Sequence, residues 1–232
     1  MNTEISVVLA ARNEANSLAE LLPQIKNVVL KSVEVIVVDD CSSDSTGRVA
    51  ELAGARVLRN PSRLGQTASL RKGLSVANGD VIITMDADGE HDPRDIPRLA
   101  EALRGNVRWL VVGRRETLPR ISERLLSIAL RPVLGVSDII CGFRAIPREI
   151  LKIAEFDRQE TWGVKFLLSC SNKGVRILEV PLRKSTVRTS ARIGGKFLGN
   201  MKVIRCLIIG VTYLIFLRVG KIFANKVSRA PS

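Results

Sequence analysis

The sequence predicts an α/β fold with a mostly parallel sheet flanked by helices. The first observation is size, because 232 residues with 46% hydrophobic content can bury one substantial core. The second is the alternation of short β-branched runs with helix-length segments. The third is that polar residues follow several of these runs. In such a sheet ligands bind at the carboxyl ends of the strands, so the loops after the strands are the places to look for chemistry.

Five apolar runs rich in valine, isoleucine and leucine are expected to be strands. They are Ile5–Ala10, Val35–Asp39, Arg56–Leu58, Val81–Met85 and Trp109–Val112. Four segments between them are expected to be helices, namely Glu14–Val29, Ser43–Ala53, Thr67–Ala77 and Pro93–Leu103. Repetition of strand, helix and strand in this way predicts a parallel sheet with helices over its faces.

Two later segments combine apolar residues with arginines. Leu118–Val136 is amphipathic, which fits either a helix packed on the domain or a helix at a membrane surface. Cys206–Leu217 is an apolar run of 12 residues, short of the roughly 20 needed to span a bilayer. We therefore expect a catalytic domain over residues 1–194 and a basic, membrane-associating helix and tail over 195–232. A terminal helix packed on the domain's own core, or a longer spanning helix, are the alternatives.

The charge balance points to anionic partners. Lys and Arg number 36 against 23 Asp and Glu, which gives a net charge of +13 and a pI near 10.3. Nucleic acid is not an expected partner, because aromatic residues are only 4% and no stacking platform is visible. The four cysteines stand singly, without metal-ligand spacing, and no secretory signal follows Met1. These features predict a reduced, cytosolic setting, at the cytoplasmic face of a membrane.

The segment Asp86-Ala87-Asp88 follows the predicted strand that ends at Met85. Two carboxylates one residue apart at a strand end can bind Mg²⁺ or Mn²⁺, which keeps waters and takes diphosphate oxygens, and Glu90 could add a third oxygen. The alternative is that these acids cap the helix that begins near Pro93.

A second acidic pair, Asp39-Asp40, follows the predicted strand that begins at Val35. A carboxylate at that place can accept hydrogen bonds from a nucleobase or ribose. The alternative is a turn with a helix cap, since the next residues are rich in Ser and Asp. A third polar loop, Ala11-Arg12-Asn13-Glu14, follows the first strand. The three loops together favour a nucleotide site over three separate caps.

Taken in order, these segments closely resemble the family 2 glycosyltransferases, which have the GT-A fold. The resemblance covers roughly residues 4 to 190. It rests on Val7–Glu14, Val37–Thr46, Asn60–Gln66, Asn78–Asp80 and Asp86–Asp88. Within that family the chain is most similar to the dolichyl-phosphate mannose synthase branch, through Gly113–Arg115, Asp138–Ala145 and Glu179–Pro181. The basic loop Arg188–Lys196 is an altered form of the one in that branch.

The resemblance implies a site for a nucleotide-sugar donor and a divalent metal ion. Donor-binding residues would be Ala11, Arg12, Glu14, Asp39, Asp40, Gln66, Asp86, Ala87, Arg188 and Lys196. The Mg²⁺ or Mn²⁺ would be held by Asp86, Asp88 and Glu90, and the catalytic residues would be Asp88, Arg114 and Arg188. The family further implies transfer with inversion.

The acceptor can be argued from chemistry. A sugar hydroxyl must lose a proton and needs a positioned carboxylate, whereas a lipid phosphate is already ionised. The segment around Lys165 lacks the acid that the family pattern places there, and four arginines are available to hold an anion: Arg114, Arg115, Arg131 and Arg144. A dolichyl or polyprenyl phosphate acceptor is therefore favoured.

The expected function is metal-dependent transfer of a sugar, mannose from GDP-mannose, to dolichyl or polyprenyl phosphate at an anionic membrane surface. One alternative is a family 2 enzyme that uses a UDP-sugar, glucose or N-acetylglucosamine, with a lipid-phosphate or hydroxyl acceptor. Another is a non-catalytic module that binds anionic lipid. Turnover of a nucleotide-sugar with Mn²⁺, lost on chelation, separates the enzymes from the binding module.

Overall fold

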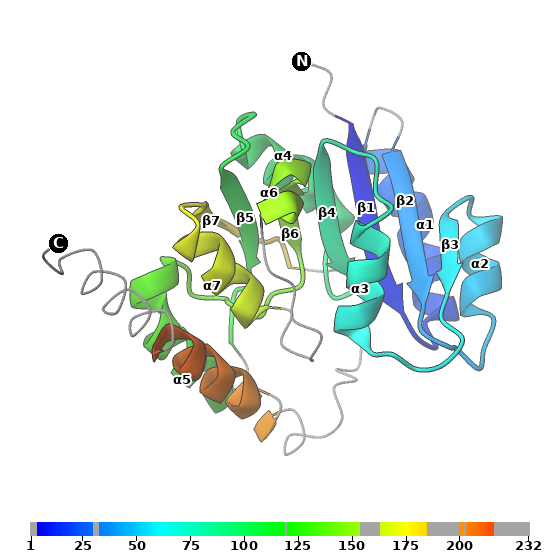
Figure 1. Cartoon of the computed structure of the whole chain (residues 1–232). Coiled ribbons are helices and arrows are strands. Elements are labelled where there is room, and N and C mark those ends of the chain that lie inside the picture. The colour runs from blue at the N-terminus through cyan, green and yellow to red at the C-terminus, as the bar shows by residue number, and fades with distance from the viewer. Residues whose placement is uncertain are drawn as a thin grey trace, which may run out of the picture.

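The computed structural model describes residues 4–29, 33–118, 120–153, 163–184, 200–201 and 203–215. These residues build a seven-stranded sheet in the order β3-β2-β1-β4-β6-β5-β7 (Figure 1). Its strands are β1 (Ile5–Ala11), β2 (Val33–Asp39), β3 (Arg56–Arg59), β4 (Val81–Asp86), β5 (Trp109–Arg114), β6 (Arg144–Pro147) and β7 (Arg176–Pro181). Strand β6 pairs antiparallel with β4 and β5, and the other pairings are parallel. The predicted mostly parallel sheet is confirmed.

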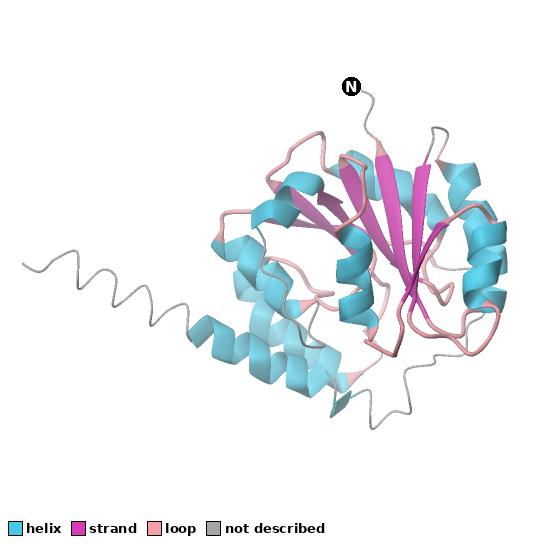
Figure 2. Cartoon of the chain, turned by 45° about the vertical axis from the view of Figure 1, so that its right-hand side comes forward, coloured by secondary structure: helices cyan, strands magenta, loops and turns pink. Residues whose placement is uncertain are grey.

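Helices cover both faces of this sheet. They are α1 (Ala15–Val28), α2 (Thr46–Leu52), α3 (Gln66–Leu74), α4 (Ile96–Ala102), α5 (Ile121–Leu134), α6 (Arg148–Ile153) and α7 (Val164–Asn172), with a 3₁₀ turn η1 (Pro93–Asp95) before α4. Helices α1 and α4 contact each other on one face, and α3 packs on β1 and β2 from the other. Figures 1 and 2 show α3 and α1 on opposite sides of the strands.

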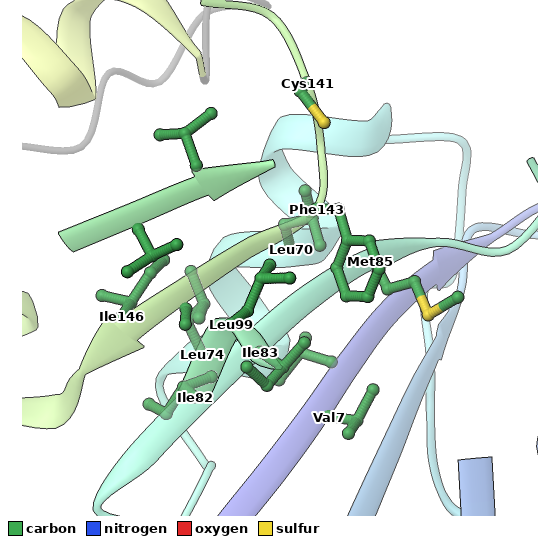
Figure 3. Packing of buried hydrophobic residues seen from close by; sticks show 14 of the residues in the cluster. Val7, Leu70, Leu74, Ile82, Ile83, Met85, Leu99, Cys141, Phe143 and Ile146 are labelled. Atoms are coloured by element: carbon green, nitrogen blue, oxygen red, sulfur yellow. The ribbon is translucent and has the colours of Figure 1, made fainter. Parts of the chain in front are cut away.

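The core lies between the sheet and these helices. Strand β4 is buried on both faces, which is why its apolar run is continuous rather than alternating. Figure 3 shows how its side chains lie between helices, with Leu70 and Leu74 of α3 and Leu99 of α4 in the same cluster as Ile82 and Ile83. This close-packed core gives the loops at the strand ends a rigid base.

All five predicted strands are present, but two of the seven strands were missed. Strand β6 is four residues long, contains Pro147 and begins with a buried arginine, so it has neither length nor apolar alternation to indicate it. One predicted helix begins three residues later than expected, at Thr46 instead of Ser43. The Asp44 carboxylate accepts hydrogen bonds from the amide and hydroxyl of Thr46, which holds the preceding residues in a turn.

The amphipathic segment Leu118–Val136 forms α5, and a helix over residues 203–215 lies beside it (Figures 1 and 2). That second helix packs partly on the domain, through the buried side chain of Val203. Within the described ranges no helix is long and apolar enough to cross a membrane. The boundary expected at residues 194 and 195 lies outside the described residues, so the division into domain and tail stays a prediction.

Candidate active site

The ends of three neighbouring strands bring the polar loops of the sequence together. In the sheet register Ala11 pairs with Asp39 and Ala10 with Asp86, so the ends of β1, β2 and β4 lie side by side. A cavity of about 800 Å³ opens at this edge, and its lining includes Arg12, Glu14 and Asp40. This volume is in the range of cavities that enclose a drug-sized ligand. The three loops therefore line a single site.

The Asp40 carboxylate holds the loop between β3 and α3. One oxygen accepts hydrogen bonds from the Asn60 side chain and the Leu64 amide, and the other accepts one from the Gly65 amide, at 2.8 to 2.9 Å. Burial acts to raise the pKa of Asp40, but these hydrogen bonds outweigh it and lower the pKa. Asp40 is thus a fixed carboxylate that shapes the cavity wall next to Gly65 and Gln66.

The loop after β1 is locked to the loop after β2. The Thr46 hydroxyl accepts a hydrogen bond from the Glu14 amide at 2.8 Å, and the Asn13 side chain accepts one from the Ser43 amide at 2.8 Å. Asn13 has a positive φ of 56°, which an asparagine tolerates better than most residues. The turn leaves Arg12 exposed on the cavity wall.

Asp86 ends β4 and is contacted from three sides. The Gln66 side-chain amide donates to Oδ1 at 2.6 Å, and His91 Nδ1 lies 3.8 Å from Oδ2. Burial lowers the pKa of His91, so the ring is neutral and this contact is polar rather than an ion pair. A Cβ added at Gly142 would lie 2.6 Å from Asp86 Oδ2, so a larger residue there would displace the Asp86 carboxylate.

Asp88 lies among other carboxylates on the cavity wall. Burial raises the pKa of Asp88 to about 7, and the charges of Asp86, Glu90 and Glu14 act in the same direction. A wall on which negative charges repel one another suits a cation. Among the described residues, however, no three acidic, His or Cys side chains converge into a ready-made metal cluster. The expected ligand set of Asp86, Asp88 and Glu90 therefore stays a prediction, and an ion at this wall could take its other ligands from diphosphate and water.

The cavity lining also includes two arginines joined by buried acids. Arg115 Nε and Nη2 donate to the two oxygens of Asp138, both at 2.8 Å, and Nη2 also reaches Glu123 at 3.3 Å. Glu123 accepts a second hydrogen bond from Arg120 at 2.6 Å. Asp138 and Glu123 are buried, whereas Arg115 and Arg120 line the cavity. The lining thus contains a group of carboxylates, here called the carboxylate wall, and the pair Arg115 and Arg120, here called the arginine wall.

The other predicted anion-binding arginines do not line this cavity. Arg114 and Arg131 are exposed outside it. Arg144 is fully buried in β6, where Nε and Nη2 donate to the carbonyl oxygens of Cys141 and Ile139. Arg144 therefore supports the loop next to Asp86 instead of facing an acceptor. Arg188 and Lys196 lie outside the described residues.

Sequence reasoning missed Arg120 and His91 as cavity residues. Arg120 appeared as one of several arginines in an amphipathic segment, and its position immediately before the first turn of α5 was the one available signal. It also missed Val203 and Cys206, which come from the helix over residues 203–215 and line the same cavity. Nothing in the sequence indicates that this distant segment returns to the site.

The mostly parallel sheet, with its cavity at the carboxyl ends of β1, β2 and β4, has the arrangement of a GT-A fold. The chain belongs to the glycosyl transferase family 2, whose family model matches residues 6–152. The predicted resemblance to this family is therefore confirmed.

Two relatives and one solved structure illustrate the similarity. The chain is 30% identical over 199 residues to the dolichol-phosphate mannosyltransferase of Pyrococcus furiosus, covering 77% of this chain and 55% of that one. The undecaprenyl-phosphate mannosyltransferase of Micrococcus luteus is 32% identical over 203 residues, covering 77% and 82%. Glucosyl-3-phosphoglycerate synthase of Mycobacterium tuberculosis, solved with Mn²⁺ and UDP-glucose, has a TM-score of 0.75 and 29% identity, covering 90% and 79%. The chain thus spans little more than half of the first of these relatives.

Proposed function

We propose that this protein transfers a sugar, mannose from GDP-mannose, to a dolichyl or polyprenyl phosphate at the cytoplasmic face of a membrane. The observation that carries the proposal is the presence of a carboxylate wall and an arginine wall in one cavity. The names of the two mannosyltransferase relatives support the same sugar and the same class of acceptor.

The donor would lie against the carboxylate wall. Arg12, Glu14 and Asp40 line the part of the cavity where the base and ribose are expected, with Gln66 next to Asp86. Asp86 and Asp88 would hold Mg²⁺ or Mn²⁺, which, when bound, neutralises charge on the departing diphosphate as a Lewis acid. The solved synthase with Mn²⁺ and UDP-glucose supports a divalent ion at this kind of site.

The acceptor phosphate would lie against Arg115 and Arg120. A guanidinium binds phosphate through its N–H donors, and the Glu123 carboxylate holds the two groups together by accepting a hydrogen bond from each. Nε and Nη2 of Arg115 already donate to Asp138, so Nη1 would be the donor that faces the phosphate. A phosphate oxygen is ionised at neutral pH, so this side of the cavity needs no general base.

Arg120→Met is expected to raise the KM for polyprenyl phosphate about tenfold or more while leaving the KM for the donor near its original value, because a charged hydrogen bond to phosphate is lost. Steady-state kinetics in detergent, varying each substrate in turn, measure both. Arg124→Met is the matched control, since Arg124 is exposed one turn further along α5 and does not line the cavity. Equal acceptor KM values for the two variants would contradict the assignment of Arg120.

Asp40→Ala is expected to raise the donor KM about tenfold with a smaller change in kcat, because three hydrogen bonds that hold the loop at the donor side are lost. Asp39→Ala serves as the control. Asp39 accepts a hydrogen bond from the Ser42 amide at 3.0 Å but does not line the cavity. A donor KM unchanged in Asp40→Ala, or raised equally in both variants, would count against a donor-side role specific to Asp40.

A UDP-sugar is the one alternative to GDP-mannose as the donor. The UDP-glucose bound to the solved synthase supports a UDP-sugar donor, with a lipid phosphate or a hydroxyl as acceptor. A thermal-shift series with GDP, UDP and ADP, each with Mn²⁺, discriminates the two, because a bound ligand raises the melting temperature by mass action. GDP is expected to give the largest shift. A larger shift with UDP would replace GDP-mannose by the UDP-sugar alternative.

A further inference from the structure

His91 is a cavity residue whose side chain is almost wholly buried. The side chain is 3% accessible, and its ring packs on Phe143 with the ring centroids 5.1 Å apart. Within the described part of the chain, Nδ1 of this ring has no hydrogen-bond partner. Buried polar groups are normally hydrogen-bonded, because leaving one without a partner is costly. The position of Nδ1 therefore needs an explanation.

The nitrogen without a partner faces the Asp86 carboxylate. Nδ1 lies 3.8 Å from Oδ2 of Asp86, which is about 0.8 Å longer than an ordinary N–H···O hydrogen bond. The other oxygen, Oδ1, already accepts a hydrogen bond from the Gln66 side chain at 2.6 Å. An ionised carboxylate can only accept hydrogen bonds, so His91 is attracted to it when the ring carries its proton on Nδ1.

The second ring nitrogen has a partner that favours this tautomer. Nε2 lies 3.8 Å from Sγ of Cys141, within hydrogen-bond range for sulfur. The Cys141 side chain is buried, and burial raises the pKa of its thiol to about 12, so the sulfur keeps its proton. If the S–H group donates to Nε2, the single N–H of an uncharged imidazole lies on Nδ1.

The loop that carries Cys141 is fixed against β4. The Thr84 hydroxyl donates to the Gly142 carbonyl oxygen at 2.7 Å, and the glycine leaves space for the Asp86 carboxylate. Figure 3 shows Cys141 and Phe143 along this loop, with Met85 of β4 beside the Phe143 ring. The donor to Nε2 and the acceptor facing Nδ1 therefore belong to the same rigid part of the core.

We propose that His91 is a positioning residue, whose Nδ1–H donates to Oδ2 of Asp86 and orients this carboxylate for a divalent ion. Gln66 holds the other oxygen. The inference rests on the proposed function, which assigns Asp86 to the metal site. Hydrogen bonds that orient metal ligands matter for affinity, and their loss typically weakens metal binding about 10- to 100-fold.

The test is the affinity of the full-length chain for Mn²⁺ with saturating GDP, and separately with UDP, measured from the EPR signal of free Mn²⁺. Two variants separate the ring nitrogens. In His91→Asn the side-chain amide nitrogen can take the place of Nδ1, and in His91→Gln it can take the place of Nε2. Phe143→Leu is the packing control, because it removes the ring contact and leaves both nitrogens of His91.

His91→Gln is expected to bind Mn²⁺ about tenfold more weakly, whereas His91→Asn and Phe143→Leu bind within about threefold of the unaltered chain. Melting temperatures without metal are expected to fall in all three variants, so a role in packing alone would not produce this order. The inference is overturned if His91→Gln and His91→Asn bind Mn²⁺ equally. It is also overturned if pulsed EPR of the unaltered chain shows a histidine nitrogen bound to the ion.

A second measurement needs no variant. His91 is the single histidine of the chain, so ¹⁵N NMR of protein labelled at histidine reports its tautomer directly. With Mg²⁺ and GDP bound, the proton is expected on Nδ1. A proton on Nε2 with none on Nδ1 would overturn the inference.

The outcomes also separate this inference from the proposed function. If the unaltered chain binds Mn²⁺ and transfers the sugar, but the two His91 variants bind Mn²⁺ equally, the positioning role alone is overturned. If the unaltered chain binds no Mn²⁺ with either nucleotide, the proposed metal site is overturned and the role of His91 with it.

Discussion

Asp88→Asn is expected to lower transfer by about a thousandfold or more while the protein stays folded. An amide keeps the shape of the side chain but removes the negative charge that a divalent ion requires. The effect is expected on kcat/KM measured with saturating Mn²⁺.

The same substitution is expected to stabilise the metal-free protein at pH 8. The pKa of Asp88 is raised to about 7 in the folded chain, above its ordinary value, so the folded state binds its proton more tightly than the unfolded state does. The stability from this group is full at low pH and is lost as pH rises through 7. Asparagine cannot ionise, so the variant's melting temperature should exceed that of the original chain at pH 8 and differ little at pH 4.

The control for both effects is Asp80→Asn. Asp80 immediately precedes β4, at the end of the strand opposite to the cavity, and its carboxylate accepts a hydrogen bond from the Glu4 amide at 3.4 Å. It is exposed, so its loss should leave transfer and stability near their original values. Near-normal transfer by a folded Asp88→Asn protein at limiting Mn²⁺ would remove Asp88 from the metal site.

Arg115→Met is expected to destabilise the fold by about 3 kcal/mol or more, because it leaves buried Asp138 without its paired donors. Asp138 has no exposed surface and accepts from Arg115 through the backbone amide, Nε and Nη2. Although burial acts to lower the pKa of Arg115, the hydrogen bonds and charge of Asp138 raise it, so the guanidinium stays charged. Urea denaturation at constant pH measures the change.

The adjacent Arg114 offers a matched control for that variant. It ends β5 with an exposed side chain outside the cavity, so Arg114→Met should change the free energy of unfolding by no more than about 0.5 kcal/mol. Equal destabilisation by the two variants would show that the Arg115 network does not hold this wall.

The sequence alone could not predict which of the two arginines contributes more to stability, because the difference arises from which of them meets Asp138.

The strand ends were predictable because their chemistry is local. A buried valine and isoleucine run followed by Asp-Ala-Asp identifies β4 and its carboxylates without any knowledge of neighbouring strands. The parallel register then places Asp39 and Asp86 beside Ala11 and Ala10. The positions of Asp86 and Asp88 thus followed from the sequence, whereas it did not indicate that Asp40 lines the cavity and Asp39 does not.

The arginine wall was less predictable, because it depends on long-range partners. Arg144 and Arg115 look alike in the sequence, because both are arginines in predicted anion-binding motifs. In the structure Arg144 is buried and donates to the Cys141 carbonyl, whereas Arg115 pairs with Asp138, 23 residues away. The return of Val203 and Cys206 to the cavity depends on the packing of a terminal helix on α5 and α7. Such contacts are set by tertiary packing, which periodicity and motif spacing do not encode.

The most direct test of the central proposal is a transfer assay with two acceptors that differ only in the phosphate. Labelled GDP-mannose and Mn²⁺ are supplied with either polyprenyl phosphate or the corresponding polyprenol, and label in the lipid phase is measured with and without a chelator. We expect label in the lipid only with polyprenyl phosphate and only while the metal is present. Equal transfer to the polyprenol, or transfer that survives chelation, would contradict the proposal.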